Sequence, residues 1–65
     1  MIEEVGETAG EIWNLLNEKG ELSLSGVQSN STKTRSLVNM GIGWLLREDK
    51  ITMSKGERGI RISLK

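Results

Sequence analysis

The feature that most restricts the fold of this chain is a change of hydrophobic period near residue 50. Before it, apolar residues recur at the spacing of a helix; after it, they alternate with polar residues, the spacing of a strand. The alternating apolar residues are Ile51, Met53, Ile60, Ile62 and Leu64. Between the two alternating runs lies KGERG, residues 55–59, which is typical of a hairpin loop. Because two strands are not stable alone, the hairpin is expected to pack on helices.

The segment 33–50 has the longest clear helical periodicity. At about 100° per residue, its main apolar face consists of Val38, Ile42, Leu45 and Leu46. An apolar flank widens this arc to roughly 200° and consists of Leu37, Gly41 and Trp44. We therefore expect a deeply buried helix, capped by Ser31, Thr32 or Thr34, with Trp44 lying under the hairpin. The remaining strip is Lys33, Ser36, Asn39, Met40, Gly43 and Arg47.

A first amphipathic helix is predicted from the apolar positions Val5, Ala9, Ile12, Trp13 and Leu16, with Trp13 in the core. Thr8 and Glu11 fit a capping box, so the helix begins either at Thr8 or earlier, near Glu3. Lys19-Gly20 marks its end. The spacing of Gly6 and Gly10 favours close packing of a neighbouring helix at these two residues.

Residues 21–24 alternate and predict a very short strand, which would pair with the hairpin. A brief helix over Leu24–Asn30 is expected next, capped by Ser23, with Leu24 and Val27 facing inward. The resulting order is helix, strand, helix, helix, strand, strand. These 65 residues are therefore expected to form one α+β domain, residues 1–65, of the winged helix-turn-helix class. It would have three helices, a small antiparallel sheet and a C-terminal hairpin wing.

Two segments, GETAGEIWNLLNEKGELSL and MGIGWLLREDKI, resemble a family of small prokaryotic winged helix-turn-helix proteins first grouped as a domain of unknown function. The resemblance extends from about Val5 to Leu64 and is most specific at residues 6–10, 12–13 and 43–51. It implies the winged-helix fold and a DNA-binding role inferred from that fold. It supplies no catalytic residues.

Charge is distributed unevenly although the formal net charge is zero. Residues 1–32 contain six Glu against Lys19, a balance of −5, and residues 33–65 contain eight Lys or Arg against three acids, a balance of +5. This asymmetry indicates either an anionic partner for the C-terminal half or attraction between the halves within the fold.

Double-stranded DNA is the first partner to consider, because the N-terminal turns of the third helix would enter the major groove. Lys33 and Arg35 suit phosphate or guanine, and Asn39 suits adenine if it reaches the groove floor. Wing cations would contact an adjacent groove or the backbone. The candidate DNA-binding residues are Thr32, Lys33, Thr34, Arg35, Ser36, Asn39, Lys55, Arg58 and Arg61. The alternative interpretation is a solvated helix end and an ordinary charged hairpin tip.

Contact with protein is the second class of function. Gly43 would admit a partner's backbone, Met40 adapts to an irregular apolar surface, and Leu37 and Trp44 extend the same lobe. A pI near 6.2 is unfavourable for a monomer that must bind phosphates, whereas a homodimer would double the basic footprint. A homodimerisation or protein-interaction module of the same fold is therefore the alternative to DNA binding.

Enzymatic activity is not expected, because the chain contains no His and no Cys and no Gly-rich phosphate loop. For the same reason no metal site and no cofactor is predicted. No apolar run reaches the roughly 18 residues of a membrane span, and the acidic start Met1-Ile2-Glu3-Glu4 is unlike a signal peptide. A cytoplasmic location is the expectation.

Overall fold

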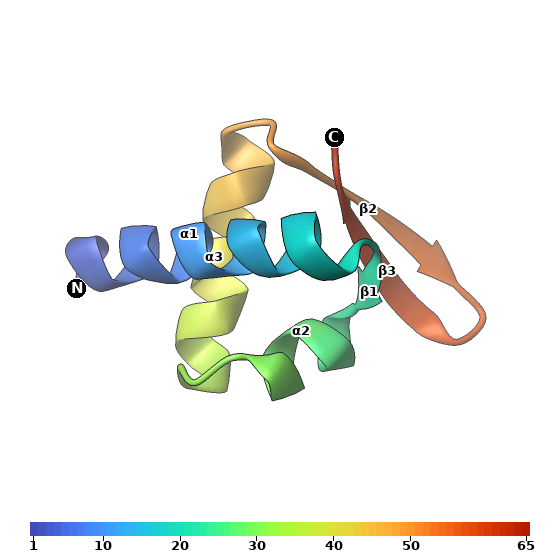
Figure 1. The fold of residues 1–65 in the computed structure, drawn as a ribbon, viewed down its shortest axis with the longest axis horizontal. Coiled ribbons are helices and arrows are strands. Elements are labelled where there is room, and N and C mark those ends of the chain that lie inside the picture. Colours follow the sequence, from blue (N-terminus) through green and yellow to red (C-terminus); the bar gives the residue numbers. More distant parts are fainter.

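The computed structural model describes residues 1–65 and has the order of elements expected from the sequence. In Figure 1, α1 lies across α3, α2 lies near the N-terminal end of α3, and the hairpin of β2 and β3 stands near the C-terminal end of α1. The elements are α1 (Ile2–Lys19), β1 (Leu22–Ser23), α2 (Leu24–Asn30), α3 (Arg35–Arg47), β2 (Ile51–Gly56) and β3 (Gly59–Leu64).

The sheet has three antiparallel strands in the order β1-β3-β2, so the last strand of the chain is the central one. Ile62 of β3 is opposite Leu22 on one side and Met53 on the other. Ile62 is fully buried in the core with helical residues, so its side chain faces the helices, as the alternation predicted. The expected pairing of the short first strand with the hairpin is confirmed, and it occurs through β3.

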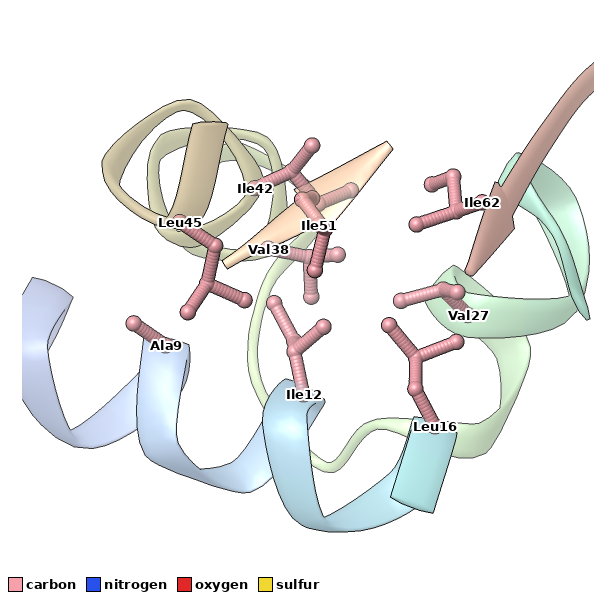
Figure 2. Packing of buried hydrophobic residues seen from close by; sticks show 9 residues of the cluster. All are labelled: Ala9, Ile12, Leu16, Val27, Val38, Ile42, Leu45, Ile51 and Ile62. Atoms are coloured by element: carbon pink, nitrogen blue, oxygen red, sulfur yellow. The ribbon is translucent and has the colours of Figure 1, made fainter. Parts of the chain in front are cut away.

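The core is a cluster of buried apolar side chains from all three helices and from both strands of the hairpin (Figure 2). Ile12, Val27, Val38 and Ile62 are each fully buried. The cluster consists of Ala9, Ile12, Leu16, Val27, Val38, Ile42, Leu45, Ile51 and Ile62. Packing of the hairpin on the helices therefore depends on Ile51 and Ile62, one from each of the two alternating runs.

Of the helical glycines, Gly41 of α3 makes the tightest contact with a neighbouring helix; of the two predicted positions, Gly6 makes ordinary contact with Trp44 of α3 and Gly10 makes none. A Cβ atom added to Gly41 would lie 3.2 Å from the backbone N of Ala9 and 3.0 Å from Cδ1 of Ile12. A Cβ atom at Gly10 would meet nothing within 4 Å. Thus the helix that contributes the glycine is α3, and α1 contributes its backbone.

Three large side chains predicted to lie in the core are partly exposed. Trp13 is 37% exposed, Trp44 39% and Leu46 43%. Because α1 crosses α3, full burial is confined to the crossing and to the sides that face the sheet, and residues at the edges of each apolar arc stay half covered. The indole of Trp44 lies against Gly6, with ring atoms 3.9 Å from the Cβ position there, and not under the hairpin.

Helix α1 begins at Ile2, so of the two predicted starts the earlier one is correct and the capping box at Thr8 does not form. Thr8 is fully buried, and its hydroxyl donates to the carbonyl oxygen of Glu4 at 2.7 Å. That bond keeps a buried hydroxyl satisfied within the helix. Helix α3 ends at Arg47, three residues before the predicted end at Lys50. After it, Asp49 adopts a positive φ of 61° and turns the chain toward β2.

Both predicted caps in the middle of the chain are present. Ser23 accepts a hydrogen bond from the backbone N–H of Gly26 at 3.0 Å, which begins α2. Thr34 accepts one from the backbone N–H of Leu37 at 3.2 Å, which begins α3. Each satisfies a donor that the first turn of a helix leaves free.

Thr34→Ala is expected to lower the free energy of unfolding by about 1 kcal/mol, because the first turn of α3 loses its cap. Thermal unfolding followed by far-UV circular dichroism measures the loss. Thr32→Ala, two residues before the cap and outside the helix, is the matched control and should change stability by less than about 0.5 kcal/mol. Equal losses in the two variants would show that the cap does not stabilise α3.

Candidate nucleic-acid interface

The turn between α2 and α3 is held on α1 by side-chain hydrogen bonds. The hydroxyl of Ser31 donates to Oε1 of Glu11 at 2.6 Å, and the backbone N–H of Lys33 donates to the same hydroxyl at 3.0 Å. A residue of the acidic first helix therefore positions the start of the third. This connection gives α2 and α3 a defined relative placement.

Two of the candidate DNA-binding residues lie in this turn and not on the third helix, which was predicted to begin at Lys33. Thr32 and Lys33 precede the helix because Thr34 is its N-cap. Arg35 and Ser36 form the exposed first turn of α3, as expected. The hydroxyl of Thr34 accepts from Leu37, so its lone pairs are partly used within the protein.

The side chain of Asn39 on α3 is hydrogen-bonded to a side chain of α2. Its Oδ1 accepts a hydrogen bond from Nε2 of Gln28, on α2, at 3.0 Å. Gln28 is half-buried, whereas Asn39 is exposed. Sequence reasoning missed Gln28, because the contact depends on the placement of α2 against α3, which periodicity does not report. The available signal was an amide directly after Val27, which was predicted to face inward.

The cations of α3 and of the wing border neighbouring hollows on one surface. A hollow of about 400 Å³ is lined by Ser25, Gln28, Ser29 and Arg35. A second, of about 390 Å³, is lined by Ser23, Leu24, Ser25, Gln28, Lys55, Arg58, Gly59 and Ile60. Ser25 and Gln28 belong to both hollows. These two shared residues of α2 therefore connect the hollow beside Arg35 with the hollow beside Lys55 and Arg58.

The third predicted wing cation, Arg61, is engaged elsewhere. Its Nε donates to Oε2 of Glu21 at 2.9 Å, and both side chains are about half exposed. The pair joins β3 to the residue that precedes β1. Arg61 lines neither of the two hollows, so the structure does not bring it together with Lys55 and Arg58.

Acidic side chains are absent from α2, α3 and all three strands. They occur only on α1 and in turns, at Glu3, Glu4, Glu7, Glu11, Glu18, Glu21, Glu48, Asp49 and Glu57. Of these, Glu57 lies at the wing tip, between Lys55 and Arg58. The cations Lys33, Arg35, Lys55 and Arg58 make no ion pair. Their charge is therefore free to act on an external anion.

Beside Asn39 lies a hollow of different character, with a volume of about 250 Å³. It is formed between α3, the start of α2 and strand β2. Four of its six lining residues are apolar, and the lining is Leu24, Asn39, Ile42, Gly43, Leu46 and Met53. The part of α3 that faces the wing thus changes from polar at its N-terminal end to apolar in its middle.

Helix α2, a short turn and helix α3, followed by a hairpin that packs on them, define a winged helix-turn-helix. The fold is shared with the solution NMR structure of a protein from Bacteroides thetaiotaomicron, with a TM-score of 0.84 and 27% identity. The match covers 95% of this chain and 76% of that one. The expected fold class is confirmed.

The chain belongs to the family described as winged helix-turn-helix domain (DUF2582), whose model matches residues 1–64. An uncharacterized protein of the archaeon Methanocaldococcus jannaschii is 47% identical to it over 64 residues. That alignment covers 94% of this chain and 90% of the relative. The resemblance found in the sequence is confirmed. None of the helices combines the length and the apolar character that crossing a membrane requires.

Proposed function

We propose that this domain binds double-stranded DNA. The first turns of α3 would enter the major groove, and the wing tip would contact the phosphate backbone. Arg35 belongs to the helix, Lys33 to the turn before it, and Lys55 and Arg58 to the wing. Sequence-specific binding of this kind would serve transcriptional regulation.

The observation that carries the proposal is the joining of Arg35 to Lys55 and Arg58 through the surface of α2. The hydroxyl of Ser25 lies between these cations and is a suitable donor to phosphate, whereas that of Ser29 donates to the carbonyl oxygen of Gly26 at 3.3 Å. A polyanion would therefore find positive charge at both ends of this surface and a neutral hydrogen-bond donor between them. Neither α2 nor α3 contains a carboxylate that would repel the polyanion.

Binding to a labelled random-sequence duplex should fall steeply with salt, because each cation on a phosphate releases a counterion. The Arg35→Ala/Arg58→Ala double variant is expected to bind more weakly. The negative slope of log K against log salt should become shallower by about 2. Fluorescence anisotropy at several salt concentrations measures both quantities.

The matched control is Lys19→Ala/Lys65→Ala, which also removes two positive charges. Lys19 lies at the end of α1, and Lys65 pairs with Asp49. Its slope should stay close to that of the unmodified protein. Equal effects of the two double variants would contradict binding at the proposed surface.

Contact with protein is the second candidate function, and the exposure of two tryptophans favours it. Trp13 and Trp44 are both more than a third exposed, and Ile2, on the same side of α1 as Trp13 by helical spacing, is 69% exposed. Exposed aromatic side chains are enriched in protein interfaces. Absence of DNA binding at low salt, together with a molar mass that rises with protein concentration, would favour this candidate over DNA.

A further inference from the structure

The hydrogen bond between Gln28 and Asn39 leaves a defined set of polar groups unused. Nε2 of Gln28 donates to Oδ1 of Asn39, so Oε1 of Gln28 stays a free acceptor and Nδ2 of Asn39 a free donor. Turning both amides over would exchange the two roles and preserve the set. In either orientation the pair offers one free carbonyl oxygen on one side chain and one free amino group on the other.

An apolar surface adjoins this amide pair. Asn39 itself lines the hollow of about 250 Å³, together with Ile42, Gly43 and Leu46 on the next turns of α3. A Cβ atom at Gly43 would meet nothing within 4 Å, so the absence of a side chain keeps the hollow open. Met53 of β2 and Leu24 of α2 complete its apolar lining. A donor–acceptor pair and an open apolar hollow therefore lie side by side on the face of α3 that the proposed function turns toward DNA.

We propose that this juxtaposition reads an A·T base pair in the major groove, an inference that rests on the proposed DNA binding. Adenine presents the acceptor N7 beside the donor N6 amino group. With both amides turned over, Nε2 of Gln28 donates to N7 and Oδ1 of Asn39 accepts from the N6 amino group, which puts Asn39 and the hollow beside it on the thymine side of the base pair. The 5-methyl group of the paired thymine is the one apolar group on that edge, and the hollow beside Asn39 receives it.

Guanine does not satisfy the same groups. Its major-groove edge carries two acceptors, N7 and O6, so O6 would face the free carbonyl oxygen of the amide pair. Its partner cytosine has no methyl group, and the apolar hollow would be left facing water or an amino group. Reading by two side chains also explains why Asn39 is held from α2: each amide fixes the rotation of the other.

The test compares duplexes that differ only in the major groove. Alternating A·T and alternating inosine·cytosine duplexes present the same minor-groove groups, whereas inosine has the major-groove edge of guanine. The unmodified protein should bind the A·T duplex about tenfold more tightly than the inosine·cytosine duplex. Replacing thymine with deoxyuridine, which lacks the methyl group, should weaken binding about threefold.

Asn39→Ala should reduce the preference for A·T over inosine·cytosine from about tenfold to about threefold, the part that the thymine methyl group contributes, while leaving the salt slope and the far-UV circular dichroism spectrum unchanged. The deoxyuridine effect should persist in this variant, because the hollow is retained. Asn17→Ala, which removes an exposed amide from α1, is the matched control and should keep the preference for A·T.

Three results would overturn the inference. Equal, salt-dependent affinities of the unmodified protein for all three duplexes would remove base reading and leave the proposed DNA binding intact. A preference for A·T over inosine·cytosine that stays at about tenfold in Asn39→Ala would place the reading elsewhere. No binding to any duplex at low salt would overturn the inference and the proposed function together.

Discussion

Gly41→Val is expected to lower the free energy of unfolding by about 3 kcal/mol, the upper part of the usual range for overpacking a core. A Cβ atom at this position would already lie 3.2 Å from the backbone N of Ala9 and 3.2 Å from Cγ2 of Thr8. Valine adds two further methyl groups at the same place. Because the nearest atoms include helix backbone, α1 as a whole must shift, and the gain in helix propensity of roughly 0.4 kcal/mol does not offset this.

Urea unfolding followed by far-UV circular dichroism measures the loss. Gly43→Val is the matched control: it lies on the same helix and gains the same side chain, but a Cβ atom there meets nothing within 4 Å. Its stability should stay within about 0.5 kcal/mol of the unmodified protein. If both valines cost the same, the close approach of α1 to Gly41 is not a determinant of stability.

Ile62→Ala is expected to cost about 3 kcal/mol as well, for the opposite reason, because it leaves a cavity. Ile62 is fully buried and lies on the central strand, opposite Leu22 and Met53. Figure 2 shows its side chain above Val27 and on the same side of the core as Leu16. Truncation thus removes the contact by which the sheet packs on α2 and α1.

Arg61→Ala is the control for this variant, since its side chain points to the other face of the same strand. Loss of its exposed pair with Glu21 should cost less than about 1 kcal/mol. A domain of this size rarely has more than about 3–5 kcal/mol of stability, so Ile62→Ala should be largely unfolded near physiological temperature. The two urea midpoints should differ clearly; similar midpoints would show that the sheet is not anchored at Ile62.

The features predicted correctly are those that depend on neighbours in sequence. Alternation at Ile60, Ile62 and Leu64 is a property of one strand, and it predicted both the hairpin and its buried face. Ser23 and Thr34 cap helices that begin at the next residue, so each cap is visible within four residues. Even the two-residue strand β1 was predicted, because residues 21–24 alternate between polar and apolar.

The features that were missed depend on how α1 crosses α3. Trp13 lies within the apolar arc of its helix but beyond the part that α3 and the sheet cover. Gly6 and Gly10 have the spacing of close packing, yet the crossing falls at Gly41. The pairing of Gln28 with Asn39 spans two helices. A helical wheel gives directions around one axis, and it contains no information about where a second axis passes.

The confinement of carboxylates to α1 and the turns has a consequence for the approach to a ligand. A molecule with no net charge but with separated charges carries an electric dipole, and a dipole rotates in the field of a polyanion before contact is made. Encounter complexes would therefore form preferentially with α1 directed outward. Raising the ionic strength should weaken this alignment and slow association, even though the total charge is zero.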